Sequence, residues 1–529
     1  MTSEMHAHTA CAQPGAKMDS NRIKTLVELM GQGASDAVCI AAADAAPLTY
    51  AKLRQLSSYV MSVLNESGIG RENRVAIVMP NGPMMATSFM TFTACTTTAP
   101  LNPSYRVDEY DFYMRDLGAQ ALVVERGSQS PALMVATRLK VPVIYLDPTP
   151  DQGAGSFTMD TSGMHTVRAH APGPAQPDDI AMVLHTSGTT SKPKIVPLTQ
   201  RNITASARNI ANTTQFTATD RGLNVMPLFH IHGLIAGILA PVSRGGSVYC
   251  TTGFNALKFF NIMDEAHPTW YTAVPTMHQA ILSRAANNVE VIQRNPLRFI
   301  RSSSSALLPQ VQAELEKFFS APVIQAYGMT EAAHQMCCTP LPPGVNKPGS
   351  VGLPAGPEVA IMDAEGNLQP RNTIGEIVIR GENVTPGYEN NTKANAENFT
   401  SGWFRTGDQG MMDDDGYVSI TGRIKEIINR GGEKISPLEI DEILLDHPAV
   451  RQVVCFGIPH PKLGEEVGAA VVLREGMEAT EAELRQHVAQ RVADFKVPRR
   501  VLRLEAIPLN DTGKMQRIGM AKRLGLVDD

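Results

Sequence analysis

Hydrophobic positions along the chain follow two spacings, which predict helices and buried strands in alternation. In residues 50–69 the apolar side chains recur every three or four positions, and this spacing predicts an amphipathic helix. The short, continuous apolar runs at 74–80 and 121–126 instead predict strands that are covered on both faces. Because such segments alternate through most of the chain, we expect an α/β fold built on parallel sheets.

Two breaks in this pattern, together with the length of the chain, predict more than one domain. A proline-rich stretch at 170–179 leads into a short apolar strand and a polar loop, and a turn-rich β segment at 402–422 precedes a pattern typical of a small α+β unit. A chain of 529 residues is also too long for one ordinary core. We expect a large N-terminal domain of stacked α/β subdomains at 21–422, a small mobile C-terminal domain at 423–529, and a disordered tail at 1–20.

Helix-start signals support the small C-terminal unit. Ser436, Pro437 and Glu439 have the spacing of a capping box whose first helical residue is proline. Thr480 and Glu483 form a second candidate capping box, directly before an apolar row at helical spacing. We therefore expect one helix to begin after Ser436 and another to begin after Thr480.

Composition and charge narrow the class of protein. Hydrophobic residues make up 43% of the chain and charged residues 19%, which is ordinary for a globular protein. The net charge of −5 gives no general attraction to nucleic acid, and the longest apolar run, at 233–242, is about half the length that crosses a bilayer. Seven cysteines, an odd number without a CxxC pair, indicate a reducing compartment. We expect a cytoplasmic protein without membrane insertion, and the oligomeric state stays open.

The stretch "HTSGTTSKPK" at 185–194 carries the densest chemical signal. Its hydroxyls, exposed backbone N–H groups and two lysines suit a polyphosphate. It lacks the Gly-Lys-Ser/Thr ending of a P-loop, and the nearest GxG, at 31–36, lacks the third glycine of a dinucleotide fingerprint. A turn of this composition is by itself more often an ordinary loop, but its position directly after an apolar strand favours phosphate binding.

Five motifs in order make the signal specific. They are "TSGTTSKPK", "YGMTE" at 327–331, "GWFRTGD" at 402–408, "GRIKE" at 422–426 and "NDTGKMQR" at 510–517. Together they resemble the adenylate-forming enzymes, a family that includes acyl-CoA synthetases, luciferases and the adenylation domains of peptide synthetases. The resemblance extends from about residue 25 to 525. Ser191 departs from it, because the family usually has glycine at that position.

The resemblance implies an ATP-dependent reaction in two steps. A carboxylate attacks the α-phosphate of ATP, and a thiol, usually that of coenzyme A, then displaces AMP. Thr330 is expected at the α-phosphate, and Glu331 is expected to hold Mg²⁺, which prefers oxygen ligands. The residues expected to bind the rest of ATP are Thr186, Ser187, Gly188, Thr189, Thr190 and Lys194 for the β- and γ-phosphates, Asp408 and Arg423 for the ribose, and Tyr327 for adenine.

The resemblance also assigns roles to residues of the C-terminal domain. Lys514 is expected to bridge the attacking carboxylate and the α-phosphate, because its compact ammonium neutralises charge on both reactants. Lys425 matches the hinge about which the small domain rotates. Gly432 and Lys434 are then expected to line the path of coenzyme A, and His230 matches the residue that separates the acid from this path.

The acid itself is expected to be small and polar. Buried hydroxyls and imidazoles need partners, which a fatty acyl chain does not offer. The expected acid-binding residues are His232, Ser303, Ser304 and His334, the two serines lying in the run "RSSSSALLP" at 301–309. A second carboxylate would satisfy them, and the set looks closest to the oxalate–CoA ligase branch of the family.

Other functions remain open at this point. The first is a short- or medium-chain acyl-CoA synthetase with a polar pocket. A stand-alone adenylation domain that serves a carrier protein is a second, and a non-catalytic nucleotide-binding protein of the same fold is a third. A P-loop NTPase is disfavoured by the missing motif, and formation of AMP rather than ADP would separate it from the others.

Overall fold

A computed structural model gives the fold and describes residues 23–164, 166–186, 193–509 and 515–527. The first large sheet has seven strands, of which the inner ones are parallel and the two edge strands antiparallel. The predicted strands at 74–80 and 121–126 are both among the parallel ones. In spatial order, the seven strands of this sheet are β7 (Phe157–Asp160), β6 (Val143–Pro148), β5 (Ala121–Glu125), β3 (Arg74–Ile77), β4 (Thr97–Pro100), β8 (Ile180–Thr186) and β9 (Lys194–Thr199).

The second large sheet has nine strands and is parallel except at its two edges. In spatial order they are β16 (Leu353–Pro354), β15 (His334–Cys338), β14 (Val323–Met329), β13 (Phe299–Ser303), β12 (Trp270–Ala273), β10 (Arg221–Asn224), β11 (Ser247–Cys250), β1 (Val38–Ala41) and β2 (Leu48–Thr49). The serine run therefore leaves the sheet at the carboxyl end of β13, where ligands bind in open α/β sheets.

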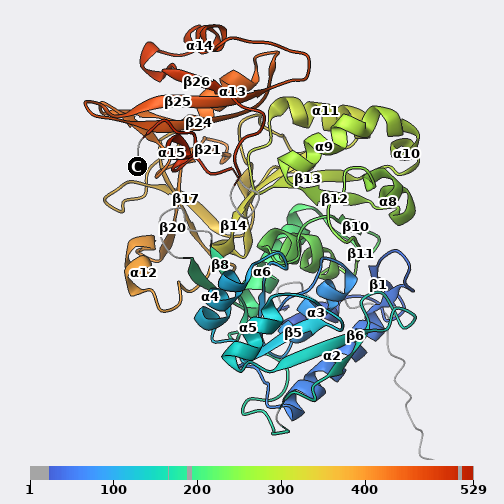
Figure 1. The fold of residues 1–529 in the computed structure, drawn as a ribbon. Helices are drawn as coiled ribbons and strands as arrows, with labels where there is room; N and C mark the ends of the chain where they lie inside the picture. The colour runs from blue at the N-terminus through green and yellow to red at the C-terminus, as the bar shows by residue number, and fades with distance from the viewer. Residues whose placement is uncertain (1–22, 165, 187–192, 510–514, 528–529) are drawn as a thin grey trace, which may run out of the picture.

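Helices fill the space between these sheets and cover their outer faces (Figure 1). The inner layer contains α1 (Leu26–Met30), α2 (Tyr50–Glu66), α3 (Pro83–Thr93), α6 (Gln200–Thr213), the π-helix η2 (His232–Leu239) and α7 (Ala240–Val242). The outer face of the seven-stranded sheet carries α4 (Val107–Leu117) and α5 (Ala132–Leu139). That of the nine-stranded sheet carries α8 (Phe259–Ala266), α9 (Pro275–Ala285), α10 (Val289–Arg294) and α11 (Pro309–Phe319). The predicted architecture of stacked α/β layers is confirmed.

A third, five-stranded antiparallel sheet follows the two large ones in the chain. Its strands are β17 (Glu358–Met362), β18 (Gly375–Arg380), β20 (Trp403–Met412), β19 (Phe399–Thr400) and β21 (Val418–Arg423), and α12 (Thr392–Asn398) precedes β19. The hairpin of β20 and β21 pairs Asp408 directly with Arg423. The hairpin thus brings together residues of two consecutive motifs.

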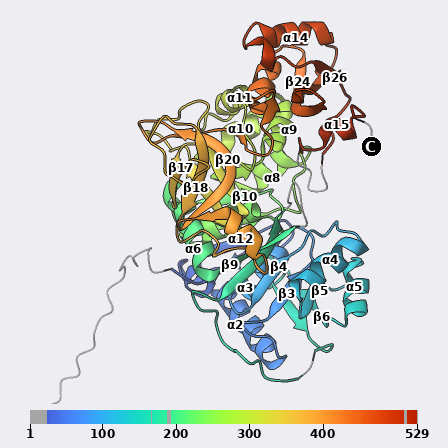
Figure 2. The same cartoon turned by 90° about the vertical axis from the view of Figure 1, so that its left-hand side faces the viewer.

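The last sheet forms a separate small unit at one end of the molecule (Figure 2). Its strands are β23 (Glu433–Ile435), β22 (Ile428–Arg430), β25 (Gly464–Leu473), β24 (Val450–His460) and β26 (Arg500–Arg503). One face packs on α13 (Pro437–Leu445) and α14 (Glu481–Ala489), and the other on α15 (Met520–Arg523). Gln310 of α11 donates a hydrogen bond to Asp446 at 3.1 Å and links this unit to the nine-stranded sheet. The boundary at 423 stays a prediction.

The two predicted capping boxes have different outcomes. Thr480 accepts from the backbone of Glu483, whose carboxylate accepts from the backbone of Thr480, so this box is confirmed. The box at Ser436 was wrong, although the helix begins with Pro437 as expected. The Ser436 hydroxyl donates to the carbonyl of Thr421 instead. A tertiary contact across the domain junction thus replaces the local cap.

Candidate active site

The ends of the phosphate loop are held together by the sheet. Thr186, the last residue of β8, pairs with Lys194, the first residue of β9, so the hydroxyl and the ammonium flank the loop between them. His185, the residue before, contacts Asp116 of α4 through Nε2 and Oδ2 at 2.9 Å, which fixes the end of β8. The remaining predicted members of the loop, Ser187, Gly188, Thr189 and Thr190, lie outside the described residues.

Glu331 and Lys194 meet around one tyrosine. Glu331 lies in the short helix η4 (Thr330–Ala332) and is 6% exposed, and Oε1 accepts a hydrogen bond from the hydroxyl of Tyr388 at 2.8 Å. The ammonium of Lys194 stands over the ring of Tyr388, 4.4 Å from its centre. Burial raises the pKa of Glu331, while the Tyr388 hydroxyl and the cations of Arg423 and Lys194 oppose this shift. A partly compensated buried carboxylate of this kind suits a divalent cation.

Sequence reasoning missed Tyr388. It lies in "TPGYEN", where a proline–glycine turn before an aromatic residue is too common a pattern to indicate a role. The residue after it, Glu389, pairs with Arg74 of β3 at 2.5 Å and anchors this segment to the seven-stranded sheet.

The three residues expected at adenine and ribose form a second cluster. Asp408 is 5% exposed, and its two oxygens each have a donor: the hydroxyl of Tyr327 at 2.5 Å and Nε of Arg423 at 2.9 Å. Tyr327 comes from β14, whereas Asp408 and Arg423 face each other across β20 and β21. Burial and the neighbouring Asp408 raise the pKa of Tyr327, so it remains a hydrogen-bond donor. Thr330 follows β14 directly and lies between this strand and Glu331 in the chain.

Three of the four predicted acid-binding residues come together at the carboxyl ends of the strands. His232, the first residue of η2, contacts the Ser304 hydroxyl through Nδ1 at 3.0 Å and that of Thr272 through Nε2 at 2.7 Å. The ring of His334 stacks on that of His232, with ring centres 4.9 Å apart and planes at 22°. Both histidines are 2% exposed, whereas Ser304 is exposed. The group therefore presents a serine hydroxyl backed by two buried imidazoles.

Backbone conformation around this group is unusual. Ser304 has φ +74° and His334 has φ +103°, values that side chains with a Cβ rarely adopt. Strain of this kind persists where the surrounding structure imposes it, and it is concentrated at functional sites. Ser303 is buried by contrast, and its hydroxyl donates to the carbonyl of Ala326 at 2.6 Å. The hydroxyl hydrogen of Ser303 is therefore bonded within the sheet and is not directed toward the acid.

Arg301 was not among the expected acid-binding residues. It is the first residue of the serine run and lies in β13, fully buried, with its guanidinium 3.4 Å from Nε2 of His232 and 3.1 Å from Oε1 of Gln335. The residue pattern around the serine run does not reveal which of its side chains face His232. Thr272 was missed for the same reason.

The remaining predicted residues belong to other segments of the chain. His230 is half-buried, and its ring contacts that of Phe229 with centres 4.5 Å apart. Lys425 is exposed and follows β21. Gly432 has φ +100° in the turn between β22 and β23, with open space where a Cβ would stand, and Lys434 is exposed beside it. Lys514 lies outside the described residues.

An ion cluster lies just beyond the proposed hinge. Arg517 is 9% exposed and contacts Asp441 at 2.6 Å, Glu426 at 3.4 Å and the carbonyl of Cys455 at 2.9 Å. Glu426 follows Lys425 directly, and Asp441 lies in α13. Three segments of the small unit are therefore joined by one guanidinium.

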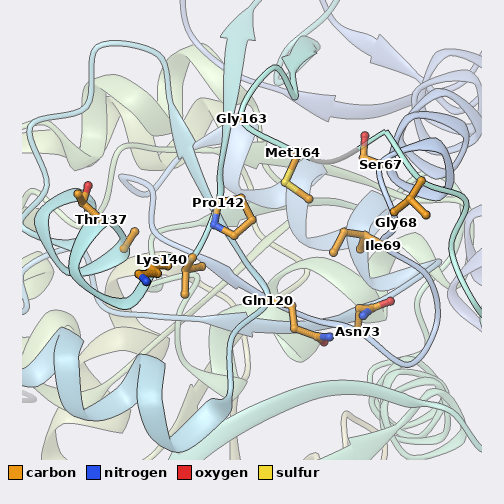
Figure 3. Close-up of a pocket in the computed structure, with 13 residues that line it drawn as sticks. Ser67, Gly68, Ile69, Asn73, Gln120, Thr137, Lys140, Pro142, Gly163 and Met164 are labelled. Atoms are coloured by element: carbon orange, nitrogen blue, oxygen red, sulfur yellow. The ribbon is translucent and has the colours of Figure 1, made fainter.

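Two cavities lie away from these clusters. One of about 470 Å³ is lined by residues such as Asn73, Gln120, Lys140 and Met164 at the seven-stranded sheet (Figure 3). The other, of about 550 Å³, is lined by Asp220, Arg298 and their neighbours. Neither includes a residue expected in the site. Within the described part of the chain, no helix is long and apolar enough to cross a membrane.

Comparison with known proteins agrees with this arrangement. Residues 30–389 match the family described as AMP-binding enzyme, and residues 439–514 match the AMP-binding enzyme C-terminal domain. The chain belongs to this family of ATP-binding, adenylate-forming enzymes, as the five motifs predict.

Individual relatives and solved structures show which members of the family the chain is similar to. The chain is 42% identical to an oxalate–CoA ligase of Arabidopsis thaliana, over 94% of this chain and 98% of the relative. It is 43% identical to an oxalate–CoA ligase of Saccharomyces cerevisiae, over 84% and 86%. Its fold matches ATP-bound MatB of Rhodopseudomonas palustris with a TM-score of 0.84 at 27% identity, over 94% and 98% of the two chains. It also matches o-succinylbenzoate–CoA synthetase of Bacillus subtilis in complex with ATP and magnesium, with a TM-score of 0.78 at 26% identity, over 94% and 99%.

Proposed function

We propose that the protein is an AMP-forming acid–CoA ligase that converts oxalate, ATP and coenzyme A into oxalyl-CoA, AMP and pyrophosphate. One oxalate carboxylate attacks the α-phosphorus, and the bond to the pyrophosphate oxygen breaks. The thiolate of coenzyme A then attacks the acyl carbon, and AMP leaves with the electron pair of the acyl–oxygen bond. The relatives named as oxalate–CoA ligases, similar over most of their length, support this choice.

The observation that carries the proposal is the polar group at the carboxyl ends of β12 and β13. His232, Ser304 and His334 lie together there, and Thr272 and Arg301 lie behind them. Among them the Ser304 hydroxyl is exposed, and a hydrocarbon chain lying over it would offer no hydrogen-bond acceptor, at a cost of about 1–3 kcal/mol. A small acid with a second carboxylate can accept from this hydroxyl. The geometry therefore favours oxalate over a fatty acid.

On the ATP side, we assign roles that follow the two clusters. Thr186 and Lys194 flank the β- and γ-phosphates, Thr330 contacts the α-phosphate, and the Asp408–Arg423 pair binds the ribose beside Tyr327. Glu331 fits Mg²⁺, since it is a buried carboxylate that shares Tyr388 with Lys194. When bound, Mg²⁺ would neutralise charge on the phosphates as pyrophosphate departs.

The small domain, which we place at 423–529, completes the site in this proposal. Lys514 bridges the carboxylate and the α-phosphate in the first step. Rotation at Lys425 then brings the turn with Gly432 and Lys434 to the thiol path, which His230 separates from the acid. We place the enzyme in the cytoplasm, because the six described cysteines are all buried free thiols.

A panel of acids tests the proposal. Purified full-length protein with ATP, Mg²⁺ and coenzyme A is assayed for pyrophosphate, AMP and thioester with oxalate, malonate, acetate, octanoate and 4-coumarate. We expect AMP, not ADP, and the highest kcat/KM for oxalate. Preference for octanoate or coumarate would refute the substrate, and absence of AMP with every acid would refute the activity. Glu331→Gln is the matched inactive control.

A further inference from the structure

Arg301 is a buried cation that lacks a carboxylate partner in the described part of the chain. Its exposed fraction is 0%, and its hydrogen bonds go to neutral groups: Gln335 Oε1 at 3.1 Å and His232 Nε2 at 3.4 Å. Its Nε has no hydrogen-bond partner there. Burial lowers the pKa of Arg301 to about 10, and the thiol of Cys338 opposes this shift. The guanidinium stays charged at neutral pH, and an uncompensated buried charge is costly to the fold.

The position of this charge dictates the hydrogen bonds of His232. A guanidinium only donates, so an N–H on Nε2 of His232 would face an N–H of Arg301 across 3.4 Å. The stable arrangement has a lone pair on Nε2 and the proton on Nδ1. Thr272, 2.7 Å from Nε2, can donate to the same lone pair. A doubly protonated imidazole would place two cations in contact and is disfavoured for the same reason.

The proton on Nδ1 in turn fixes the role of Ser304. Nδ1 donates to the Ser304 oxygen at 3.0 Å, so the hydroxyl hydrogen is directed elsewhere. Because Ser304 is exposed and held in a left-handed conformation, that hydrogen points toward the open side of the site. The hydrogen bonds from Arg301 to His232 and from His232 to Ser304 thus polarise the Ser304 hydroxyl, so that its hydrogen becomes a stronger donor toward the acid site.

We propose that Arg301 is a specificity-determining residue that acts through His232 and Ser304 to favour an acid with a second carboxylate. This inference rests on the proposed function and deepens it. Arg301 does not contact the acid in this account: it positions the serine donor and supplies the balancing charge. An acid with one carboxylate binds less tightly, because it has no second carboxylate to accept from Ser304 or to balance the charge of Arg301. The simpler alternative is that Arg301 only fills space between β12 and β14.

Two variants separate these explanations. Arg301→Met removes the charge at similar length. Gln335→Glu keeps the guanidinium and its packing but pairs it with a carboxylate, since Oε1 of Gln335 already accepts from Arg301. In both we expect the ratio of kcat/KM for oxalate to that for acetate to fall about 10- to 100-fold, the loss lying mainly in the KM of oxalate. The KM for ATP should stay within about twofold of wild type, because the Arg301 side chain bonds to His232 and Gln335, which belong to the acid side of the site.

Two further variants serve as controls. Arg301→Lys keeps a charge but cannot span both partners, so it should restore part of the ratio. Tyr417→Phe removes a hydroxyl that donates to the carbonyl of Val345, and it should leave the ratio within about twofold of wild type. Circular dichroism, thermal melting and ATP binding establish that each variant is folded.

The outcomes are distinct. If folded Arg301→Met or Gln335→Glu protein retains the wild-type ratio, the inference is overturned while the proposed function stands. If wild-type protein forms no AMP with oxalate, the proposed function fails, and the ratio is measured with malonate. A wild-type preference for acetate overturns both. If neither variant folds, nitrogen-15 NMR of histidine-labelled wild-type protein decides, because His232 must carry its proton on Nδ1; a proton on Nε2 would refute the inference.

Discussion

Tyr388→Phe should move the acid limb of adenylate formation to higher pH. The variant keeps the ring under Lys194, 4.4 Å away, but removes the hydroxyl that donates to Glu331 at 2.8 Å. A hydrogen bond to a charged group contributes about 1.5–3 kcal/mol. Its loss favours the protonated carboxyl by about this free energy, and the pKa of Glu331 therefore rises further.

The sign of the effect follows from the carboxylate. Burial already raises the pKa of Glu331, and the Tyr388 hydroxyl is one of the groups that oppose this. Protonated Glu331 cannot hold Mg²⁺, so activity is lost as the pH falls through this pKa. In the variant the loss begins at higher pH, whereas activity well above both pKa values approaches that of wild type.

The assay is ATP–pyrophosphate exchange between pH 5.5 and 9 at constant free Mg²⁺ and saturating acid. Titration of ATP itself is common to both proteins and cancels in the comparison. Tyr417→Phe is the matched control, because Tyr417 is 8% exposed and its hydroxyl donates to the carbonyl of Val345 at 2.7 Å, away from the site. Superimposable acid limbs for Tyr388→Phe and wild type, or an equal loss at every pH, would refute the reasoning.

Three further changes test other parts of the site. Lys514→Ala should abolish ATP–pyrophosphate exchange and spare thioester formation from pre-made acyl-adenylate; surviving exchange contradicts its role. Ser304→Ala should lower kcat/KM for oxalate about tenfold or more and leave the KM for ATP unchanged, and equal losses for both substrates would count against it. Arg517→Met leaves Asp441, whose side chain is 8% exposed, without its partner at 2.6 Å. We expect a loss of about 3–5 kcal/mol in denaturant unfolding of the small domain, and an unchanged midpoint would disprove this.

Local patterns in the sequence predicted the local structure well. The helix at 50–69 appears as α2, with Leu53, Val60 and Leu64 buried on one face. The capping box at Thr480 is present, since its partners are three residues apart. Ser436 shows the limit of such signals, because its hydroxyl found a carbonyl fifteen residues away in sequence. A local motif predicts an outcome only when no tertiary acceptor competes for the same donor.

The candidate site depends on contacts that no local pattern encodes. His232 and Ser304 are 72 residues apart, and Tyr388 and Glu331 are 57 apart. The resemblance to a family indicated Glu331 through the motif at 327–331, and His232 and Ser304 were expected from the set of hydroxyls and imidazoles at the acid. It did not indicate Arg301 or Tyr388, which act through those residues. Positioning residues depend on the fold, so their identification required the structure.

The ion cluster of Arg517 has a mechanical consequence for domain rotation. It joins Glu426, one residue beyond Lys425, to Asp441 in α13 and to the carbonyl of Cys455 in β24. If the chain turns at Lys425, all of these groups lie on the moving side, and none of their contacts has to break. The small domain then rotates as a rigid body that is fixed directly to its hinge. A displacement of the segment around Arg517 therefore rotates the backbone at Lys425, because the ion cluster resists bending between the two.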